Sequence, residues 1–225
     1  FDEAFDDVAP DLVLVVGDIN STVACAMVAK KRGVPVVHVE AGLRSFDMGM
    51  PEEINRILTD RISDLLFVTE QSGIDNLAAE GANPDSVHMT GNTMIDTLAH
   101  MLPRIERSTA LEGRDLTGDY GVVTFHRPSN VDDPDKLGRL VAFLQRECER
   151  IDLVFPVHPR TRARLEAMDA WSRLQRLPSL HLEEPLPYVD FMGALRGSRF
   201  VVTDSGGIQE ETTWLGVPCL TQRLN

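Results

Sequence analysis

Three proton-transferring side chains in this sequence stand at the ends of short apolar runs. Asp18, Glu40 and His126 follow runs with the length and composition of buried strands. A carboxyl group or an imidazole in such a place can take up and release protons, and partial burial favours a raised carboxyl pKa. The pattern therefore predicts an acid–base site, in which Gly42 allows close approach of the backbone beside Glu40.

Each of these side chains also has a structural explanation. Asp18 could instead cap the helix that follows it. His126 and Arg127 suit proton transfer and phosphate contact, but a solvated pair of loop residues is the alternative. His38 lies inside the second apolar run and is expected to be a core histidine with satisfied hydrogen bonds.

The segment Pro51–Arg61 is expected to be a helix with proline at its first position. Glu53 in its first turn is explained by the positive end of the helix. Glu52 and Arg56 are four residues apart and share a face, which predicts that they point together into a cleft. The opposing face is apolar and is expected to face the core; it consists of Ile54, Ile57, Leu58, Ile62 and Leu65.

The most informative local motif runs from Thr203 to Glu211 and reads Thr-Asp-Ser-Gly-Gly-Ile-Gln-Glu-Glu. Ser205, Gly206 and Gly207 leave a strand and begin a helix, so that free N–H groups and the helix dipole can hold a diphosphate. Glu211 follows Gly207 by one helical turn and could reach a ribose hydroxyl. An ordinary glycine-rich turn is the alternative, but it does not require so many polar residues at a strand end.

Apolar runs alternate with helical segments, which predicts an α/β fold with two doubly wound parallel sheets. We expect one domain at residues 1–103, a polar linker at 104–118 and a second domain at 119–225. Ligands of such sheets bind beyond the carboxyl ends of the strands, where the motifs above lie. The predicted strands are 12–16, 34–39, 65–68, 87–90, 121–125, 153–157, 180–182, 200–203 and 219–221. The predicted helices are 21–32, 51–61, 72–80, 94–102, 134–150, 160–168, 188–195 and 207–215.

The chain has 225 residues and a formal net charge of −13, from 35 acidic and 22 basic residues. This balance argues against nucleic acid as a partner, because phosphate backbones need clustered Lys and Arg. No stretch approaches the ~20 apolar residues of a membrane span. Cys25, Cys148 and Cys219 lack metal or redox spacing, which indicates a reducing compartment and a cytoplasmic location.

The chain is expected to be a fragment. It has no initiator Met, and residues 1–8 have the pattern of a helix end that leads directly into a buried strand. It stops shortly after the strand at 219–221, so both domains are expected to be incomplete and to leave apolar sheet faces uncovered. We therefore expect this chain, expressed alone, to be inactive or unstable.

Six motifs occur in an order typical of one family: Gly17-Asp18, His38–Arg44, Pro51–Arg56, Thr90–Asp96, His126-Arg127 and Thr203–Glu211. Through them the chain closely resembles the non-hydrolysing UDP-N-acetylglucosamine 2-epimerases along its whole length. The resemblance implies two Rossmann-like domains of the glycosyltransferase-B type, with the active site in the cleft between them. It implies the interconversion of UDP-N-acetylglucosamine and UDP-N-acetylmannosamine without NAD or a metal, by a homodimer.

The resemblance also implies a role for each matching residue. The acid–base candidates are Asp18, Glu40, Glu52 and His126. Arg56 would be an ion-pair or substrate partner, Ser205 and Gly206 would hold phosphate oxygens, and Glu211 would hold the ribose. Removal of the C2 proton and elimination of UDP would give 2-acetamidoglucal, and UDP would add back after protonation of the opposite face.

Three other functions stay open. A hydrolysing relative would release N-acetylmannosamine and UDP from the same intermediate. A retaining glycosyltransferase of the same fold would bind a UDP-sugar but would not exchange the C2 hydrogen with solvent. A nucleotide-sugar sensor would need no set of four proton-transferring groups.

Overall fold

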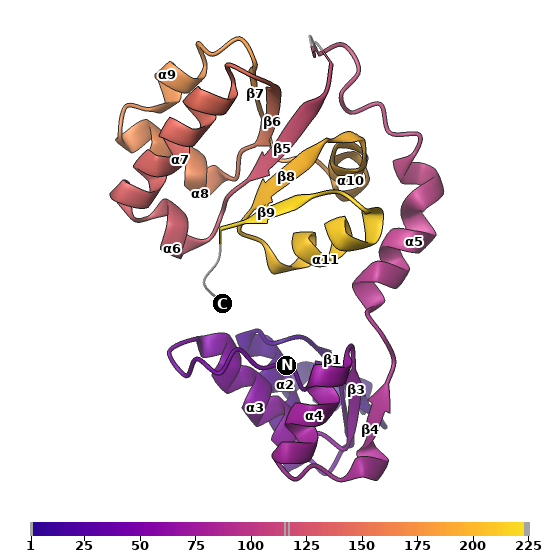
Figure 1. Cartoon of the computed structure of the whole chain (residues 1–225). Helices are drawn as coiled ribbons and strands as arrows, with labels where there is room; N and C mark the ends of the chain where they lie inside the picture. The colour runs from indigo at the N-terminus through magenta and orange to yellow at the C-terminus, as the bar shows by residue number, and fades with distance from the viewer. Residues whose placement is uncertain (1, 115, 117, 223–225) are drawn as a thin grey trace. The chain divides into compact units, whose positions relative to one another are not determined.

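The computed structural model in Figure 1 describes residues 2–114, 116 and 118–222. The chain divides into two compact units, the first ending at Thr93 and the second beginning at Met94. Both are parallel sheets flanked by helices, so the predicted α/β fold with two doubly wound domains is confirmed. Among the helices of the described residues, none combines the length and the apolar character of a membrane span.

The first unit contains four parallel strands in the order β1-β2-β3-β4. They are β1 (Val13–Val16), β2 (Val36–Ala41), β3 (Leu65–Val68) and β4 (Val87–Met89). The other elements are α1 (Asp2–Val8), α2 (Asn20–Lys31), α3 (Pro51–Ile62), α4 (Gln71–Ala79) and the short η1 (Pro84–Ser86). Because neighbouring strands are parallel and follow one another in sequence, the residues that leave β1 and β2 lie at one edge of the sheet.

The packing of the first unit is uneven between the two faces of its sheet. Val15 of β1 and Val36 of β2 form a buried cluster with Ala26 and Ala29 of α2 and Phe5 of α1. The alternate β1 side chains, Leu14 and Val16, are 55% and 53% exposed. The described helices thus leave part of an apolar sheet face open, as predicted from the sequence, whereas parallel sheets are ordinarily covered on both faces.

The second unit contains five parallel strands in the order β7-β6-β5-β8-β9. They are β5 (Tyr120–Thr124), β6 (Asp152–Pro156), β7 (Leu180–Glu183), β8 (Phe200–Thr203) and β9 (Cys219–Thr221). The helices are α5 (Thr93–Ile105), α6 (Pro128–Val131), α7 (Pro134–Glu147), α8 (Pro159–Ala167), α9 (Trp171–Leu174), α10 (Tyr188–Gly197) and α11 (Gly206–Leu215). The strand order reverses between β5 and β8, and ligands of open α/β sheets bind at such a switch point.

Helices flank both faces of the second sheet (Figure 1), and the core of this unit forms two clusters. Val123 and Phe155 pack with Leu144 of α7 and Leu165 of α8. Val122, Val154 and Val201 pack on the other face with side chains of α5, α10 and α11. Successive side chains of β5 therefore pack against helices on opposite faces of the sheet. This packing fixes the position of β5 and of its neighbour β8.

The structure has a strand at each of the nine predicted positions, with ends shifted by no more than two residues. Around the linker predicted at 104–118, the structure differs from the prediction. Helix α5 continues through Pro103 to Ile105, and its Leu98 and Ile105 are buried against the second sheet. The helix continues because burial of its regularly spaced apolar side chains stabilises it by more than the loss of the proline's backbone hydrogen bond destabilises it.

The segment that follows α5 is also attached to the second unit. Ser108 Oγ donates to Asp190 Oδ1 over 2.7 Å, and Arg114 Nη2 donates to Glu183 Oε2 over 2.7 Å. The boundary between the two compact units therefore lies after Thr93. The polar composition of 104–118 indicates a boundary at residue 103 instead.

Candidate active site

Asp18 and Glu40 lie near each other at the carboxyl edge of the first sheet. Glu40 Oε2 lies 3.6 Å from the position that a Cβ would take on Gly17. The pairing of β2 with β3 shifts register between Val39 and Ala41, and Glu40 has a φ of +72°. A positive φ at a residue other than glycine costs of order 1–3 kcal/mol and is concentrated at functional sites. The register shift and the positive φ thus set the direction in which the Glu40 side chain leaves the end of β2.

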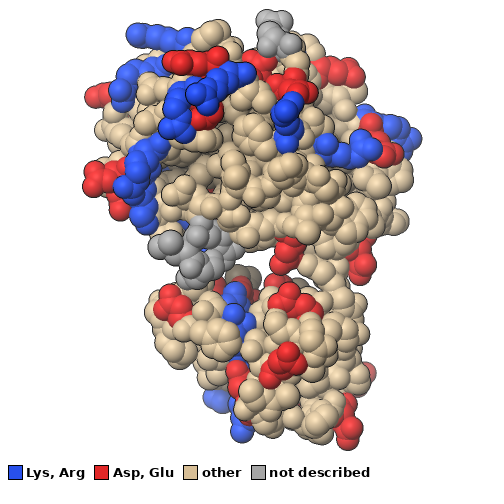
Figure 2. Space-filling model, viewed as in Figure 1, with Lys and Arg blue, Asp and Glu red and all other residues tan. Residues whose placement is uncertain are grey.

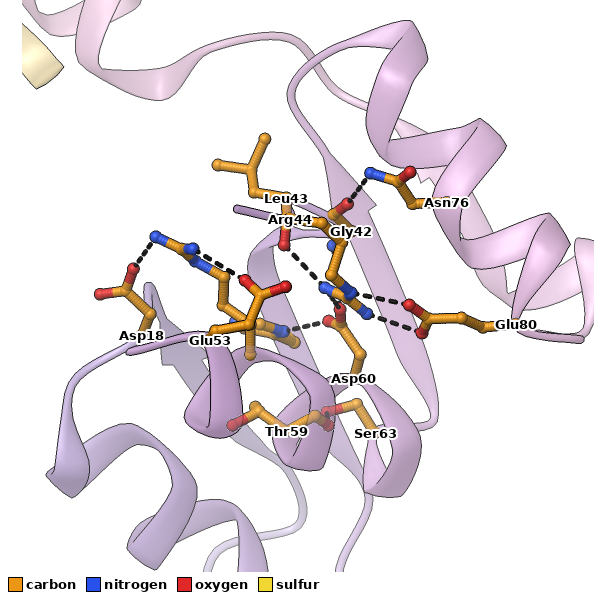
Figure 3. A network of polar contacts seen from close by, with 12 residues as sticks. Asp18, Gly42, Leu43, Arg44, Glu53, Thr59, Asp60, Ser63, Asn76 and Glu80 are labelled. Atoms are coloured by element: carbon orange, nitrogen blue, oxygen red, sulfur yellow. Dashed lines mark hydrogen bonds and ion pairs between the residues drawn. The ribbon is translucent and has the colours of Figure 1, made fainter. Parts of the chain in front are cut away.

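Arg56 of α3 connects Asp18 to a second carboxylate. Its Nη2 lies 2.6 Å from Asp18 Oδ2, and its Nη1 lies 3.2 Å from Glu53 Oε2 (Figure 3). The Arg56 side chain is 18% exposed, and the Asp18 side chain is 27% exposed. Asn55 Nδ2 also donates to the backbone carbonyl of Asp18 over 2.8 Å. Helix α3 therefore fixes both the backbone and the carboxylate of Asp18.

Glu53 is a structural member of this site that the sequence did not reveal. It is 1% exposed, and it accepts hydrogen bonds from the backbone N–H groups of Ser45 and Phe46 over 2.8 and 3.0 Å. Burial opposes ionisation, but the hydrogen bonds from Ser45, Phe46 and Arg56 outweigh it and hold the pKa of Glu53 below its usual value. Glu53 thus anchors the loop after β2 to α3.

The expectation that the apolar stripe of α3 faces the core was wrong in part. Ile54 and Leu58 are 41% and 43% exposed, whereas the buried side chains of the helix are those of Glu53, Asn55, Thr59 and Asp60. Of the predicted stripe, Ile62 does pack on the core. The polar face of α3 is turned inward because Glu53, Asn55 and Asp60 bond backbone groups of the neighbouring loops, which an apolar face cannot do.

A buried polar network lies beneath the ends of β1 and β2 (Figure 3). His38 is fully buried, and its ring nitrogens lie 2.6 Å from Asp60 Oδ1 and 3.0 Å from the carbonyl oxygen of Gly17. Arg44 Nη1 lies 2.8 Å from Asp60 Oδ2, and Arg44 Nε lies 2.7 Å from Glu80. The prediction that His38 is a satisfied core histidine is confirmed.

Close packing of the loop after β2 depends on two glycines. Gly42 has a φ of +80°, and a Cβ there would lie 2.5 Å from the carbonyl oxygen of Gly73 in α4. Asn76 Nδ2 of the same helix donates to the Gly42 carbonyl over 3.0 Å. The absent side chains let α4 approach the loop that carries Glu40.

In the second unit, buried Asp204 organises the residues after β5. Its carboxylate accepts from the backbone N–H groups of His126 and Arg127 and from Asn130 Nδ2, and His126 Nδ1 lies 3.1 Å from it. Burial raises the pKa of Asp204, but these hydrogen bonds outweigh burial and bring the pKa below its usual value. The His126 side chain stays 42% exposed. Its imidazole is therefore oriented at one nitrogen while much of the ring is accessible.

The predicted diphosphate motif begins α11 at the switch point. Ser205 is the N-cap, Gly206 is the first helical residue, and Thr203 Oγ1 accepts from the Ser205 N–H over 3.0 Å. The first N–H groups of any helix have no partner within it, and the helix dipole favours negative charge there. Ten residues of helix thus begin where β8 ends, beside the loop that carries His126.

Glu211 lies one turn into α11 and is paired with a tyrosine. It is 7% exposed, and its Oε1 accepts from the Tyr188 hydroxyl over 3.0 Å. Burial raises the pKa of Glu211, and burial together with Glu211 raises the pKa of Tyr188 to about 12. A carboxyl group held at this position with one oxygen occupied can still accept from a hydroxyl of a ligand.

Lys and Arg are numerous on the face of the second unit in Figure 2, with Asp and Glu among them, and several of these basic side chains are paired. Arg160 and Arg164 pair with Asp132, and Arg162 pairs with Glu184. The hydrogen bonds from Arg160 and Arg164 lower the pKa of Asp132 to about 2. The charges of these three Arg side chains are therefore offset by neighbouring carboxylates.

The structure brings the predicted site residues together in two groups. Asp18 pairs with Arg56 at the edge of the first sheet and Glu40 lies beside Gly17 there, while Glu52 lies exposed in the first turn of α3. The predicted residues of the second unit gather at the switch point; they are His126, Arg127, Ser205, Gly206, Gly207 and Glu211. Their individual roles, and the convergence of the two groups on one ligand, stay predictions.

The two parallel sheets with flanking helices define an α/β protein with Rossmann-like domains. The family model described as UDP-N-acetylglucosamine 2-epimerase matches residues 1–225. The chain therefore belongs to the UDP-N-acetylglucosamine 2-epimerase family, and the predicted resemblance is confirmed.

Individual relatives agree with this assignment. The chain is 39% identical over 222 residues to UDP-N-acetylglucosamine 2-epimerase of Methanocaldococcus jannaschii, with 96% of this chain and 61% of the relative covered. It is 40% identical over 217 residues to UDP-2,3-diacetamido-2,3-dideoxy-D-glucuronate 2-epimerase of Pseudomonas aeruginosa, with 95% and 59% covered. The chain thus spans about three fifths of the length of these relatives.

A solved structure shows the same fold. The crystal structure of the Methanocaldococcus jannaschii UDP-GlcNAc 2-epimerase in complex with UDP-GlcNAc and UDP matches with a TM-score of 0.88 at 37% identity. The match covers all of this chain and 63% of that chain. Both relatives named above are 2-epimerases of UDP-sugars, and they differ in the sugar.

Proposed function

We propose that the protein containing this chain interconverts UDP-N-acetylglucosamine and UDP-N-acetylmannosamine, acting as an isomerase without NAD or a metal. The observation that carries the proposal is the ion pair of Asp18 with Arg56, beside Glu40, in a chain that matches the epimerase family along its whole length. Carboxylates at a strand edge are suited to proton transfer at a sugar carbon.

The first half of the proposed reaction is an elimination. A base removes the C2 proton, the C2–H electrons form the C1–C2 double bond, and the C1–O bond breaks with its electrons leaving on UDP. The products are 2-acetamidoglucal and UDP. Because the C2 proton is weakly acidic, stabilisation of the departing UDP has to accompany its removal.

The second half restores the UDP-sugar with inverted C2. A UDP oxygen adds back to C1, and C2 takes a proton on the opposite face. Proton transfer on both faces requires at least two groups, for which Asp18, Glu40, Glu52 and His126 are the proposed candidates. Arg56 orients the Asp18 carboxylate from α3, and Asp204 orients His126 from β8.

The second unit is proposed to hold UDP. Ser205, Gly206 and Gly207 would bind the diphosphate through N–H groups at the start of α11, with Arg127 as a further phosphate contact. Glu211 would accept from a ribose hydroxyl. This division explains how a chain with a net charge of −13 could bind an anionic nucleotide.

Product analysis of UDP-N-acetylglucosamine treated with the whole protein tests this proposal. We expect UDP-N-acetylmannosamine at equilibrium with the substrate. Accumulation of free N-acetylmannosamine and UDP would support the hydrolysing alternative instead, and transfer of the sugar to an acceptor would support a glycosyltransferase. UDP-2,3-diacetamido-2,3-dideoxy-D-glucuronate should be assayed in parallel, because the Pseudomonas aeruginosa relative bears its name; a strong preference for it would overturn the proposed sugar.

We further propose a homodimer that acts in the cytoplasm. The family resemblance supports the dimer, and the unpaired cysteines Cys25, Cys148 and Cys219 support a reducing compartment. Light scattering during size-exclusion chromatography of the whole protein measures the mass directly, and a monomer mass would contradict the dimer.

A further inference from the structure

We propose that Asp60 is a positioning residue that fixes the backbone on both sides of the proposed acid–base site, an inference that rests on the proposed function. Asp60 lies near the end of α3, is 5% exposed, and has no place in the expected chemistry. Its carboxylate is connected both to the residue before Asp18 and to the loop that follows Glu40. One side chain thus reaches both strand ends.

The direct connection is to the loop after β2. Asp60 Oδ2 accepts from the Gly42 N–H over 3.0 Å and lies 2.8 Å from Arg44 Nη1. Arg44 Nη1 also donates to the Leu43 carbonyl over 2.7 Å. Since Glu40 is two residues ahead of Gly42 and has a strained backbone, a fixed position for Gly42 limits where the Glu40 carboxylate can point.

The indirect connection passes through His38. A carbonyl oxygen only accepts, so His38 Nε2 donates to the Gly17 carbonyl over 3.0 Å. His38 Nδ1 lies 2.6 Å from Asp60 Oδ1, and this carboxylate also accepts. One ring nitrogen of His38 thus contacts Asp60 and the other contacts the residue ahead of Asp18. His38 therefore connects Asp60 to the end of β1.

Asp60 lies between two basic side chains of the network. His38 and Arg44 flank Asp60, and Arg44 extends to Glu80 with two hydrogen bonds of 2.7 and 2.8 Å. The Arg44 side chain is 1% exposed and that of Asp60 is 2% exposed. Fully satisfied buried networks are rigid, whereas removing one member leaves an uncompensated charge. The loss of Asp60 should therefore disturb both strand ends at once.

Asp64 is a matched control for Asp60. It lies just beyond α3, its Oδ2 accepts from the Val36 N–H over 2.8 Å, and its Oδ1 lies 2.6 Å from Lys30 Nζ. Asp64 thus holds the start of β2 as Asp60 holds its end. Of these two aspartates, Asp60 is the one whose contacts lead to the edge that carries Asp18 and Glu40.

The experiment compares Asp60→Ala, Asp60→Asn and Asp64→Ala in the whole protein. We expect Asp60→Ala to lower kcat about 100-fold, with KM for UDP-N-acetylglucosamine changed less than about twofold, because displaced acid–base groups slow the chemical step. Asp60→Asn should recover about tenfold of that loss and stay about tenfold below wild type, since its Oδ1 can accept from Gly42 and its amide can still contact His38 Nδ1, but it lacks the charge that pairs with Arg44. Asp64→Ala should lower the melting temperature and leave kcat unchanged.

Two results would overturn the proposal: a folded Asp60→Ala protein with the wild-type kcat, or an equal loss of kcat in Asp64→Ala. If Asp60→Ala does not fold, Asp60→Asn decides, and an unchanged kcat counts against the proposal. Failure of the proposed function is recognised separately, as a wild-type protein that does not epimerise UDP-N-acetylglucosamine. In that case hydrogen exchange of the Gly42 amide still tests the positioning role: faster exchange in Asp60→Ala than in Asp64→Ala supports it, and equal exchange contradicts it.

Discussion

Arg56 Nη2 lies 2.6 Å from Asp18 Oδ2, so a residue of α3 is bonded to the carboxylate that follows β1. The same guanidinium lies 3.2 Å from Glu53, which holds the loop after β2. Two strand ends are thereby connected through one side chain. Arg fits this arrangement because its planar group presents several donors in fixed directions, which Lys does not.

Arg56→Lys should therefore impair catalysis more than folding. We expect kcat of the whole protein to fall about 10- to 100-fold, because a single ammonium group cannot hold Asp18 and Glu53 together. The matched control is Arg61→Lys, on the same helix with an exposed side chain, which should keep the wild-type kcat. Steady-state epimerisation rates for the two variants provide the comparison, and equal rates would contradict a special role for Arg56.

Gly42→Ala should destabilise the protein more than Gly33→Ala does. Both glycines have a positive φ, +80° and +74°, so both substitutions carry backbone strain of about 1 kcal/mol. Only at Gly42 would the new Cβ also meet the Gly73 carbonyl oxygen, at 2.5 Å, whereas the space beside Gly33 is open. Urea unfolding gives both free energies, and equal losses would show that the approach of α4 is not tight.

Asp204 should stabilise the second unit in a pH-dependent way. Its pKa in the folded protein is lower than the unfolded value of about 3.8, so its contribution is present above that value and is lost as the pH falls through the folded pKa. The difference in unfolding free energy between wild type and Asp204→Asn should thus be large at pH 7 and shrink below pH ~3.8. The exposed Asp169→Asn serves as a control, and a pH-independent difference for Asp204→Asn would count against this explanation.

The contribution of Glu211 to stability should depend on pH in the direction opposite to that of Asp204. Its folded pKa is raised, so the stability it contributes is present below the unfolded value of about 4.5 and is lost as the pH rises through the folded pKa. Glu211→Gln keeps an acceptor for Tyr188 and should raise the free energy of unfolding at pH 8 relative to wild type, but not at pH 4. If Glu211 binds the ribose, the same variant should weaken UDP binding about tenfold by calorimetry. The exposed Glu149→Gln should change neither quantity, and unchanged UDP affinity in Glu211→Gln would exclude the ribose contact.

Most of the fold was predictable, because each strand is a short apolar run and parallel strands leave a regular signature. The rotation of α3 was not predictable. Ile54 and Leu58 suggested the buried face, yet Glu53 and Asp60 are the buried side chains. Their partners are backbone groups and a histidine that come together only through the tertiary fold, so no spacing along the chain indicates them.

The two groups of site residues differ in how far the sequence revealed them. The start of α11 was predictable because Ser-Gly-Gly after an apolar run has a local meaning. The importance of Asp204 was not apparent, since its partners His126 and Arg127 lie 78 and 77 residues away along the chain. The extension of α5 through Pro103 was missed because proline was given more weight than the apolar spacing around it.

The most direct test of the proposed chemistry is the fate of the C2 hydrogen. UDP-N-acetylglucosamine is incubated with the whole protein in deuterium oxide, and the C2 position of the recovered UDP-sugars is followed by proton NMR. The proposed elimination and re-addition predict deuterium at C2 in the UDP-N-acetylmannosamine formed, with the exchange lost in His126→Asn and Asp18→Asn. Epimerisation that retains the original hydrogen at C2, or a complete absence of exchange in active wild-type protein, would contradict it.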